Sequence, residues 1–139
     1  MLDKIEKIMF NDIKKAKNQK EVPVAAVIVF NNKIIAHAYN KRIRKKDVTA
    51  HAEVIVIKKA AKKIKDWRLN ECDLYVTLEP CSMCKKIIKE SRIKNVYYYI
   101  SRDNNKKGYT KTEFKLLTKK TSITFQQFLT NFFKDNANR

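Results

Sequence analysis

Hydrophobic positions in the first third of the chain change their spacing twice, and each change marks a new element. Leu2–Gln19 carries one apolar stripe at helical spacing with lysines opposite, which predicts an amphipathic helix. Val22–Phe30 is almost continuously apolar and β-branched, as in a central strand buried on both faces. Asn31 and Asn32 have the composition of a hairpin turn, so Lys33–Tyr39 is expected to return as an antiparallel strand.

The middle of the chain alternates between loop, helix and strand patterns. After a basic loop at Asn40–Val48, apolar residues recur at helical spacing over Ala50–Lys65. A strand pattern at Asp73–Thr77, a helix from Ser82 to about Ser91 and a fourth strand at Val96–Ile100 follow. This order predicts a three-layer α-β-α domain in which helices pack on a mixed sheet.

The region after the fourth strand completes the expected fold. Ser101–Thr110 is rich in Asn and Lys and is expected to form a loop at the rim of a site. A short fifth strand is expected within Leu116–Ile123, which brings the sheet to about five strands. A terminal amphipathic helix is predicted by the spacing of Phe125, Phe128, Leu129, Phe132 and Phe133. Since no internal repeat or linker is present, residues 1–139 are expected to form a single domain.

Charge adds a candidate partner. The chain holds 32 Lys and Arg against 14 Asp and Glu, for a formal net charge of +18. Such an excess favours a polyanionic partner such as nucleic acid. The alternative is a genome-wide bias towards Lys, Ile and Asn, in which much of the lysine is ordinary solvated surface. Charge by itself carries no information on which nucleic-acid sequence is bound.

Cysteine usage and hydropathy bear on the compartment. No apolar run is long enough to span a membrane, and the first residues lack a signal-peptide pattern. Three cysteines do not make a disulfide framework. A reducing, cytoplasmic compartment is therefore expected.

Candidate chemistry is concentrated in two short stretches thirty positions apart. The first holds His51 and Glu53, and the second holds Cys81 and Cys84 directly after Pro80. One imidazole and two thiols have the chemistry of zinc ligands, and three protein ligands leave one tetrahedral position for water, as in catalytic zinc. Zinc lowers the pKa of such a water to about 7. Because Glu53 has no evident place as a ligand, it is expected to carry protons.

The spacing places the metal off the end of a helix. His51 and Glu53 are two residues apart and would point to nearly opposite sides of a regular helix, so both reach one metal-bound water only at its first turn. Asp47 and Thr49 are N-cap residue types just before that helix, and Pro80 precedes the next one. Two helix N-termini that face one metal would help to ionise the cysteines and the water.

Other interpretations of these residues are weighed against a catalytic zinc. A single C-x-x-C pair is also found in redox, structural or accidental settings. A closed structural zinc site with Cys72 or His37 as fourth ligand is a second alternative, but it leaves Glu53 without a role. The combination H-x-E…P-C-x-x-C is typical of zinc nucleobase deaminases, and it favours the catalytic site.

With this motif placed, the chain resembles the cytidine deaminase-like superfamily and, more closely, the bacterial tRNA-specific adenosine deaminases of the TadA family. The resemblance covers nearly the whole chain. It is carried by Glu21–Val24, Asn40, Asp47–Glu53, Leu74–Cys84, Ser91–Ile93 and the Phe132–Phe133 pair. Guanine, deoxycytidylate and riboflavin-pathway deaminases carry similar metal motifs, so the first and last of these segments are what favour the tRNA enzymes.

The resemblance implies a cytidine deaminase-like fold, one Zn²⁺ per chain and a homodimer that converts the wobble adenosine of a tRNA anticodon to inosine. His51, Cys81 and Cys84 would hold the zinc. Glu53 would take a proton from the zinc-bound water, and the resulting hydroxide would attack C6 of adenine.

Substrate contacts are implied in the same way. Asn40 is expected to bind the purine ring, and Val24 is expected to help wall the pocket. The main-chain N–H groups of Ala52 and Cys81 lie at helix starts, where they are available to the base or the intermediate. An anticodon loop suits such a site because its bases are already single-stranded.

The chain departs from the family pattern at several positions. Ala25 and Val48 stand where the family usually has Gly and Pro. Lys85 and Lys86 replace the small residues that usually follow the last cysteine, and Tyr99–Ile100 and a shifted Asp103 stand in place of the family's small pair and acidic residue. The first two positions do not touch the expected ligand set, whereas the others bear on dimer packing and on the RNA surface.

Two rival functions make different use of the same residues. A deaminase of free bases or nucleotides would not need the basic loop Lys41–Lys46. In the tRNA enzyme, the candidates to hold RNA phosphates are Arg42, Arg44, Lys45, Lys46, Lys106 and Lys107, and the alternative for each of them singly is a plain surface charge. A zinc-stabilised RNA-binding subunit without catalysis would have no use for Glu53.

Overall fold

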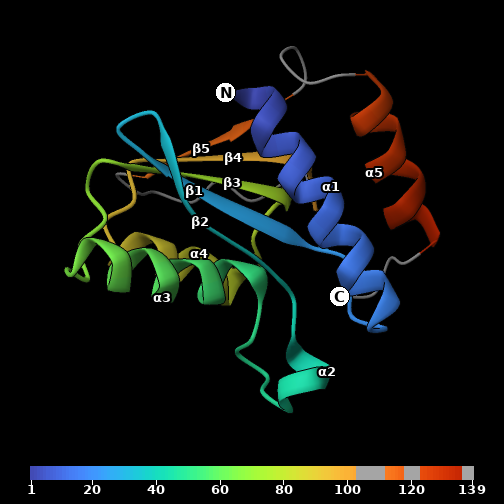
Figure 1. Cartoon of the computed structure of the whole chain (residues 1–139), viewed down its shortest axis with the longest axis horizontal. Coiled ribbons are helices and arrows are strands. Elements are labelled where there is room, and N and C mark those ends of the chain that lie inside the picture. Colours follow the sequence, from blue (N-terminus) through green and yellow to red (C-terminus); the bar gives the residue numbers. More distant parts are fainter. Residues whose placement is uncertain (103–111, 118–122, 136–139) are drawn as a thin grey trace.

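A five-stranded mixed sheet lies between two layers of helices in the computed structural model, which describes residues 1–102, 112–117 and 123–135 (Figure 1). The strands are β1 (Ala25–Phe30), β2 (Lys33–Tyr39), β3 (Cys72–Leu78), β4 (Asn95–Ile100) and β5 (Glu113–Leu116). Their order across the sheet is β2-β1-β3-β4-β5. β1 is antiparallel to both neighbours, whereas β3, β4 and β5 run parallel. The expected α/β fold with a mixed sheet is confirmed.

The helices divide between the two faces of the sheet (Figure 1). They are α1 (Leu2–Asn18), α2 (Arg42–Lys45), α3 (Ala52–Ile64), α4 (Ser82–Glu90) and α5 (Ile123–Asp135). α1 and α5 cover one face, and α3 and α4 cover the other. None of the helices in the described parts of the chain combines the length and apolar character needed to traverse a bilayer.

The central strand β1 explains why both faces are covered. Its side chains alternate between two hydrophobic clusters: Ala25 and Val27 pack with α1, and Ala26 and Ile28 pack with α3. All four are fully buried, as expected for a strand inside a three-layer domain. On the first face, the stripe of α1 predicted from its spacing supplies the buried partners Ile5, Met9, Ile13 and Ala16.

The predicted hairpin is also confirmed. Asn31 and Asn32 both have positive φ, at 51° and 60°, and Phe30 pairs with Lys33 across them. A two-residue turn with positive φ at both positions matches the twist of the strands that it joins, and asparagine tolerates this conformation well. β2 therefore folds back onto β1 and becomes an edge of the sheet.

The structure corrects the sequence predictions at two places outside the metal motif. Asn40–Val48 is not only a loop, because it contains the short helix α2. The fifth strand occupies Glu113–Leu116 and thus ends where it was expected to begin. Its four residues, Glu-Phe-Lys-Leu, alternate polar and apolar side chains, but so short and mostly exposed a stretch gives a weak sequence signal, and pairing with β4 defines the strand.

The register of the sheet brings three chain segments to one edge. Ala25, at the start of β1, pairs with Tyr39 at the end of β2. Because β1 is antiparallel to β3, the end of β3 at Leu78 lies at the same edge. The segments that begin at Asn40 and at Glu79 therefore leave the sheet side by side.

Candidate metal centre and active site

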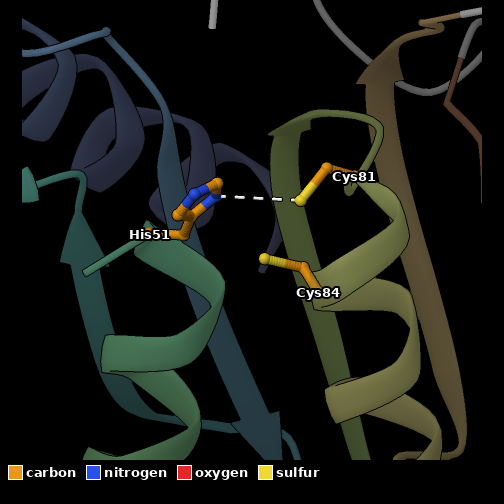
Figure 2. Close-up of side chains that lie close together, drawn as sticks. All are labelled: His51, Cys81 and Cys84. Carbon is orange, nitrogen blue, oxygen red and sulfur yellow. Dashed lines mark hydrogen bonds between the residues drawn. The ribbon is translucent and has the colours of Figure 1, made fainter. Parts of the chain in front are cut away.

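Three potential metal ligands meet at this edge, between the starts of two helices (Figure 2). His51 is the N-cap residue of α3, Cys81 is the N-cap residue of α4, and Cys84 lies in the first turn of α4. One nitrogen and two sulfur atoms from these residues all lie within 4.8 Å of one another. Cys81 Sγ and His51 Nδ1 are 3.9 Å apart. The structure thus brings together His51 and the two cysteines thirty positions later, as the sequence predicted.

The donor set fits zinc. Zinc binds thiolate sulfur at about 2.3 Å and imidazole nitrogen at about 2.0–2.1 Å, so tetrahedral ligand atoms stand roughly 3.5–4 Å apart. The observed separations need only a small contraction to meet these values. Three protein donors leave a fourth position for solvent or substrate, which is the arrangement of catalytic zinc.

The electrostatics of Cys81 suit a metal ligand. Hydrogen bonding with Cys84 first, and with His51 second, lowers the pKa of Cys81 to about 3. The thiolate is the form that binds metals, and a helix N-terminus also favours negative charge. Cys81 is therefore ionised at neutral pH.

Two buried polar side chains, Glu53 of α3 and Asn40 after β2, lie at the start of this helix. Glu53 lies in the first turn of the helix and is fully buried, where a carboxylate also complements the helix dipole. Asn40 is fully buried too, and its Oδ1 accepts a 2.7 Å hydrogen bond from the Ala52 N–H. The main-chain N–H of Ala52 is therefore engaged by Asn40, although the sequence analysis expected it to be available to substrate.

The start of α3 also corrects the capping prediction. Asp47 and Thr49 do not cap the helix, because His51 occupies the N-cap position. Instead, Asp47 Oδ1 accepts hydrogen bonds from the Thr49 main-chain N–H at 2.8 Å and from Thr49 Oγ1 at 2.7 Å. This local turn shapes the approach to the helix, and the side chain of Asn40 supplies the acceptor that a capping residue would normally provide.

The pocket expected around the metal is only partly formed by the predicted residues. Val24 is fully buried and belongs to the hydrophobic cluster under α3. A cavity of about 420 Å³ opens beside Asn40 and is also lined by Val22, Arg42 and Val48. Its lining includes none of the three metal donors, so it adjoins the metal centre rather than containing it.

The structure does not bring a fourth protein ligand to the metal centre within the described residues. Cys72 begins β3, and the six-residue rise to Leu78 separates it from the site edge by roughly 20 Å. His37 pairs with Val27 and binds Asp12 of α1 at 2.7 Å, so its side chain lies on the other face of the sheet. The closed structural site with Cys72 or His37 is not formed.

The basic segment before α3 has a defined structure. Both carboxylate oxygens of Glu21 accept hydrogen bonds from main-chain N–H groups of α2, from Ile43 at 3.1 Å and from Arg44 at 2.8 Å. This buried acid caps the short helix and holds its cations next to Asn40. Lys106 and Lys107, which were expected to act with them, lie outside the described residues.

Sequence reasoning assigned no role to Glu79, although it stands within the cysteine segment. Glu79 is buried and accepts hydrogen bonds from Lys85, Ser101 and Arg102. Its position two residues before Cys81 is the local sequence signal for a role at the site, whereas its partners Ser101 and Arg102 come from a distant part of the chain.

Comparisons with known proteins agree with this geometry. A profile of the cytidine and deoxycytidylate deaminase zinc-binding region matches residues 3–100. The tRNA-specific adenosine deaminase of Buchnera aphidicola is 40% identical over 129 residues, which span 86% of this chain and 85% of that protein.

Solved structures give the same picture. One from a study of A-to-I editing by tRNA:A34 deaminases at the wobble position of transfer RNA is 31% identical, with a TM-score of 0.68, and the match covers 78% of this chain and 94% of that chain. The guanine deaminase of Bacillus subtilis is 26% identical, with a TM-score of 0.66, over 99% of this chain and 94% of its own. The chain belongs to the cytidine and deoxycytidylate deaminase family of zinc-binding enzymes and, within it, to the tRNA-specific adenosine deaminases.

Proposed function

We propose that this enzyme deaminates the wobble adenosine of a tRNA anticodon to inosine. The observation that carries the proposal is the convergence of His51, Cys81 and Cys84 at two helix starts, with the buried carboxylate of Glu53 in the same helical turn as the histidine. The high identity to tRNA-specific adenosine deaminases over most of both chains supports the choice of substrate.

In this proposal His51, Cys81 and Cys84 hold the zinc, and Glu53 is the catalytic residue that moves protons. Bound zinc supplies a solvent molecule that is activated near neutral pH. Glu53 accepts a proton at its carboxylate and returns protons to the purine ring and to the departing amine. Its full burial excludes bulk water, so the proton stays within the site.

Asn40, Val24 and Ala52 are the proposed substrate contacts. Because Asn40 Oδ1 holds the Ala52 N–H, the proposed contact with the purine is made by the amide nitrogen of Asn40. Ala52 then acts through Asn40, by fixing the orientation of the amide, rather than by touching the base itself. Val24 supports the floor of the pocket from the hydrophobic cluster.

Cations beside Asn40 are the proposed binding surface for RNA phosphates. Burial first, and then the positive charges of Lys45 and Arg44, lower the pKa of Lys41. Burial and then Lys41 lower the pKa of Lys59 in the same way. These cations are therefore close enough to repel one another, and a polyanion would relieve that repulsion. Arg42 and Lys46 also line the cavity beside Asn40.

The assembly and the compartment are part of the same proposal. We infer a homodimer in the cytoplasm, as the resemblance to tRNA-specific adenosine deaminases implies. Sedimentation velocity of the purified protein tests the dimer, and a monomer across the micromolar range would refute it.

Substrate choice is tested by incubating the zinc-loaded enzyme with an anticodon stem-loop and, separately, with guanine, adenosine and deoxycytidylate. Inosine formed only in RNA is the expected result. The likeness to a guanine deaminase over nearly the whole chain makes free guanine the most informative rival substrate. Turnover of a monomer without turnover of RNA would overturn the proposal.

A further inference from the structure

The segment between the end of β3 and the first turn of α4 is closed by an ion pair. Lys85 Nζ lies 2.5 Å from Glu79 Oε2, and the two side chains are only 25% and 10% exposed. Residues 79–85 therefore form a ring of chain with both cysteines inside it. Partial burial makes this pair a stronger restraint than an ion pair at an open surface.

Glu79 is also anchored to the neighbouring strand. Its other carboxylate oxygen, Oε1, accepts hydrogen bonds from Ser101 Oγ at 3.2 Å and from the Arg102 N–H at 3.1 Å. Its main-chain N–H donates to Ile100 O, and its carbonyl oxygen accepts from Arg102 Nε, both at 2.8 Å. Leu78, the last residue of β3, pairs with Ile100 of β4, so these bonds continue the contact with the β4 segment by one residue, to Glu79.

Lys85 is anchored at the other end of the ring. Its main-chain N–H donates to Cys81 O at 2.9 Å, which starts the hydrogen bonding of α4. Its ammonium lies 5.6 Å from the centre of the Phe114 ring, on β5. The side chain thus joins the helix that carries both cysteines to the strands β4 and β5.

Both sulfur donors stand between Glu79 and Lys85 along the chain, and Lys85 directly follows Cys84. The position of this closed ring around both sulfur donors gives it a specific consequence for the metal.

We propose that the Glu79–Lys85 pair is a positioning device that fixes the separation and direction of the Cys81 and Cys84 sulfur atoms for zinc. The inference rests on the ligand set given under the proposed function. Neither residue touches the metal. The pair acts through the main chain by restricting the conformations that the cysteine segment can adopt, so that less freedom is lost when the metal binds.

The test measures metal affinity and ligand geometry rather than turnover. Full-length wild type, Lys85→Ala and Lys85→Met are titrated with Zn²⁺ against a chromophoric chelator, and with Co²⁺ to record the thiolate-to-metal and ligand-field bands. Outer-sphere partners typically contribute about 10–100-fold to metal affinity, so a rise of about tenfold in the zinc Kd is expected, with shifted cobalt bands. Lys85→Met keeps the apolar stem, and it serves if Lys85→Ala folds poorly.

Two controls isolate the pair. Lys86→Ala removes the same charge from an exposed neighbour and should leave both the zinc Kd and the cobalt spectrum unchanged. Glu79→Gln alone should raise the zinc Kd. The zinc Kd of the double variant Glu79→Gln/Lys85→Ala should be no higher than that of the single variant with the higher Kd, because both changes break the same ion pair. Lys85→Arg, which retains the charge, should recover most of the affinity.

The outcomes are distinct. A wild-type zinc Kd and cobalt spectrum in both Lys85→Met and Glu79→Gln would overturn the inference and leave the proposed function intact. Additive losses in the double variant would also overturn it, because the two residues would then act independently. If wild type itself binds no zinc, it is the proposed ligand set that fails.

Discussion

Tyr99 provides a quantitative test of how the helices are fixed to the sheet. This residue of β4 is fully buried between α1 and α5. Its hydroxyl donates a 3.1 Å hydrogen bond to Glu6 of α1, and its ring meets Phe125 of α5 edge-on at 5.1 Å. Tyr99→Phe removes the hydrogen bond and keeps the ring.

The size of the effect follows from the partner. A buried hydrogen bond to a carboxylate contributes about 1.5–3 kcal/mol to the free energy of unfolding. An unfolding entropy of about 2.1 cal/mol/K per residue gives roughly 0.3 kcal/mol/K for this chain, so Tm should fall by about 5–10 °C.

Differential scanning calorimetry of the zinc-loaded proteins measures this change. Tyr98→Phe is the matched control, because it removes the hydroxyl of a half-buried tyrosine on the opposite face of the same strand and should lower Tm much less. Equal Tm values for the two variants would refute the reasoning that the Tyr99 hydroxyl joins α1 to β4.

Three further predictions concern the site and its surroundings. Glu53→Gln should lower kcat by about 10²–10⁴-fold while zinc content, measured by mass spectrometry, stays at one per chain; unchanged turnover would exclude Glu53 as the proton carrier. Cys84→Ser should lose zinc, whereas Cys72→Ala should retain it; the opposite pattern would identify a different ligand set. Burial, followed by Tyr97 and Asp73, raises the pKa of Tyr75 to about 12 from 10.0, so the neutral phenol is favoured by the fold. The contribution of Tyr75 to the free energy of unfolding should be complete below pH 10 and lost as the pH rises to 12. Urea unfolding of Tyr75→Phe across this pH range should lack the loss. Identical pH profiles for wild type and Tyr75→Phe would contradict the raised pKa of Tyr75.

Much of the fold was predictable because its signals are local. The apolar stripe of α1 and the continuous apolar run of β1 can each be read within the residues of a single element. The Asn31–Asn32 pair has its own conformational preference, which the structure uses. The metal motif was likewise readable, since the chemistry of an imidazole and two thiols does not depend on the rest of the chain.

The features that were missed depend on contacts between distant residues. α2 has only four residues and forms where Glu21, twenty-two positions before Ile43, caps its main chain. The start of α3 is completed by Asn40 rather than by the capping residue types next to it. No local pattern reports such partners, because they meet only when the sheet edge has formed.

The three metal donors come from separate elements, and this has a consequence for when the metal binds during synthesis and folding. A nascent chain that has emerged only as far as α3 presents one nitrogen donor, and both sulfur donors follow a strand that must first insert beside β1. We therefore expect the ion to be captured only after β3 has paired with β1, because the three donors come together only then. Scarcity of zinc during growth would then leave a folded but idle pool that metal can later activate, rather than misfolded chains destined for degradation.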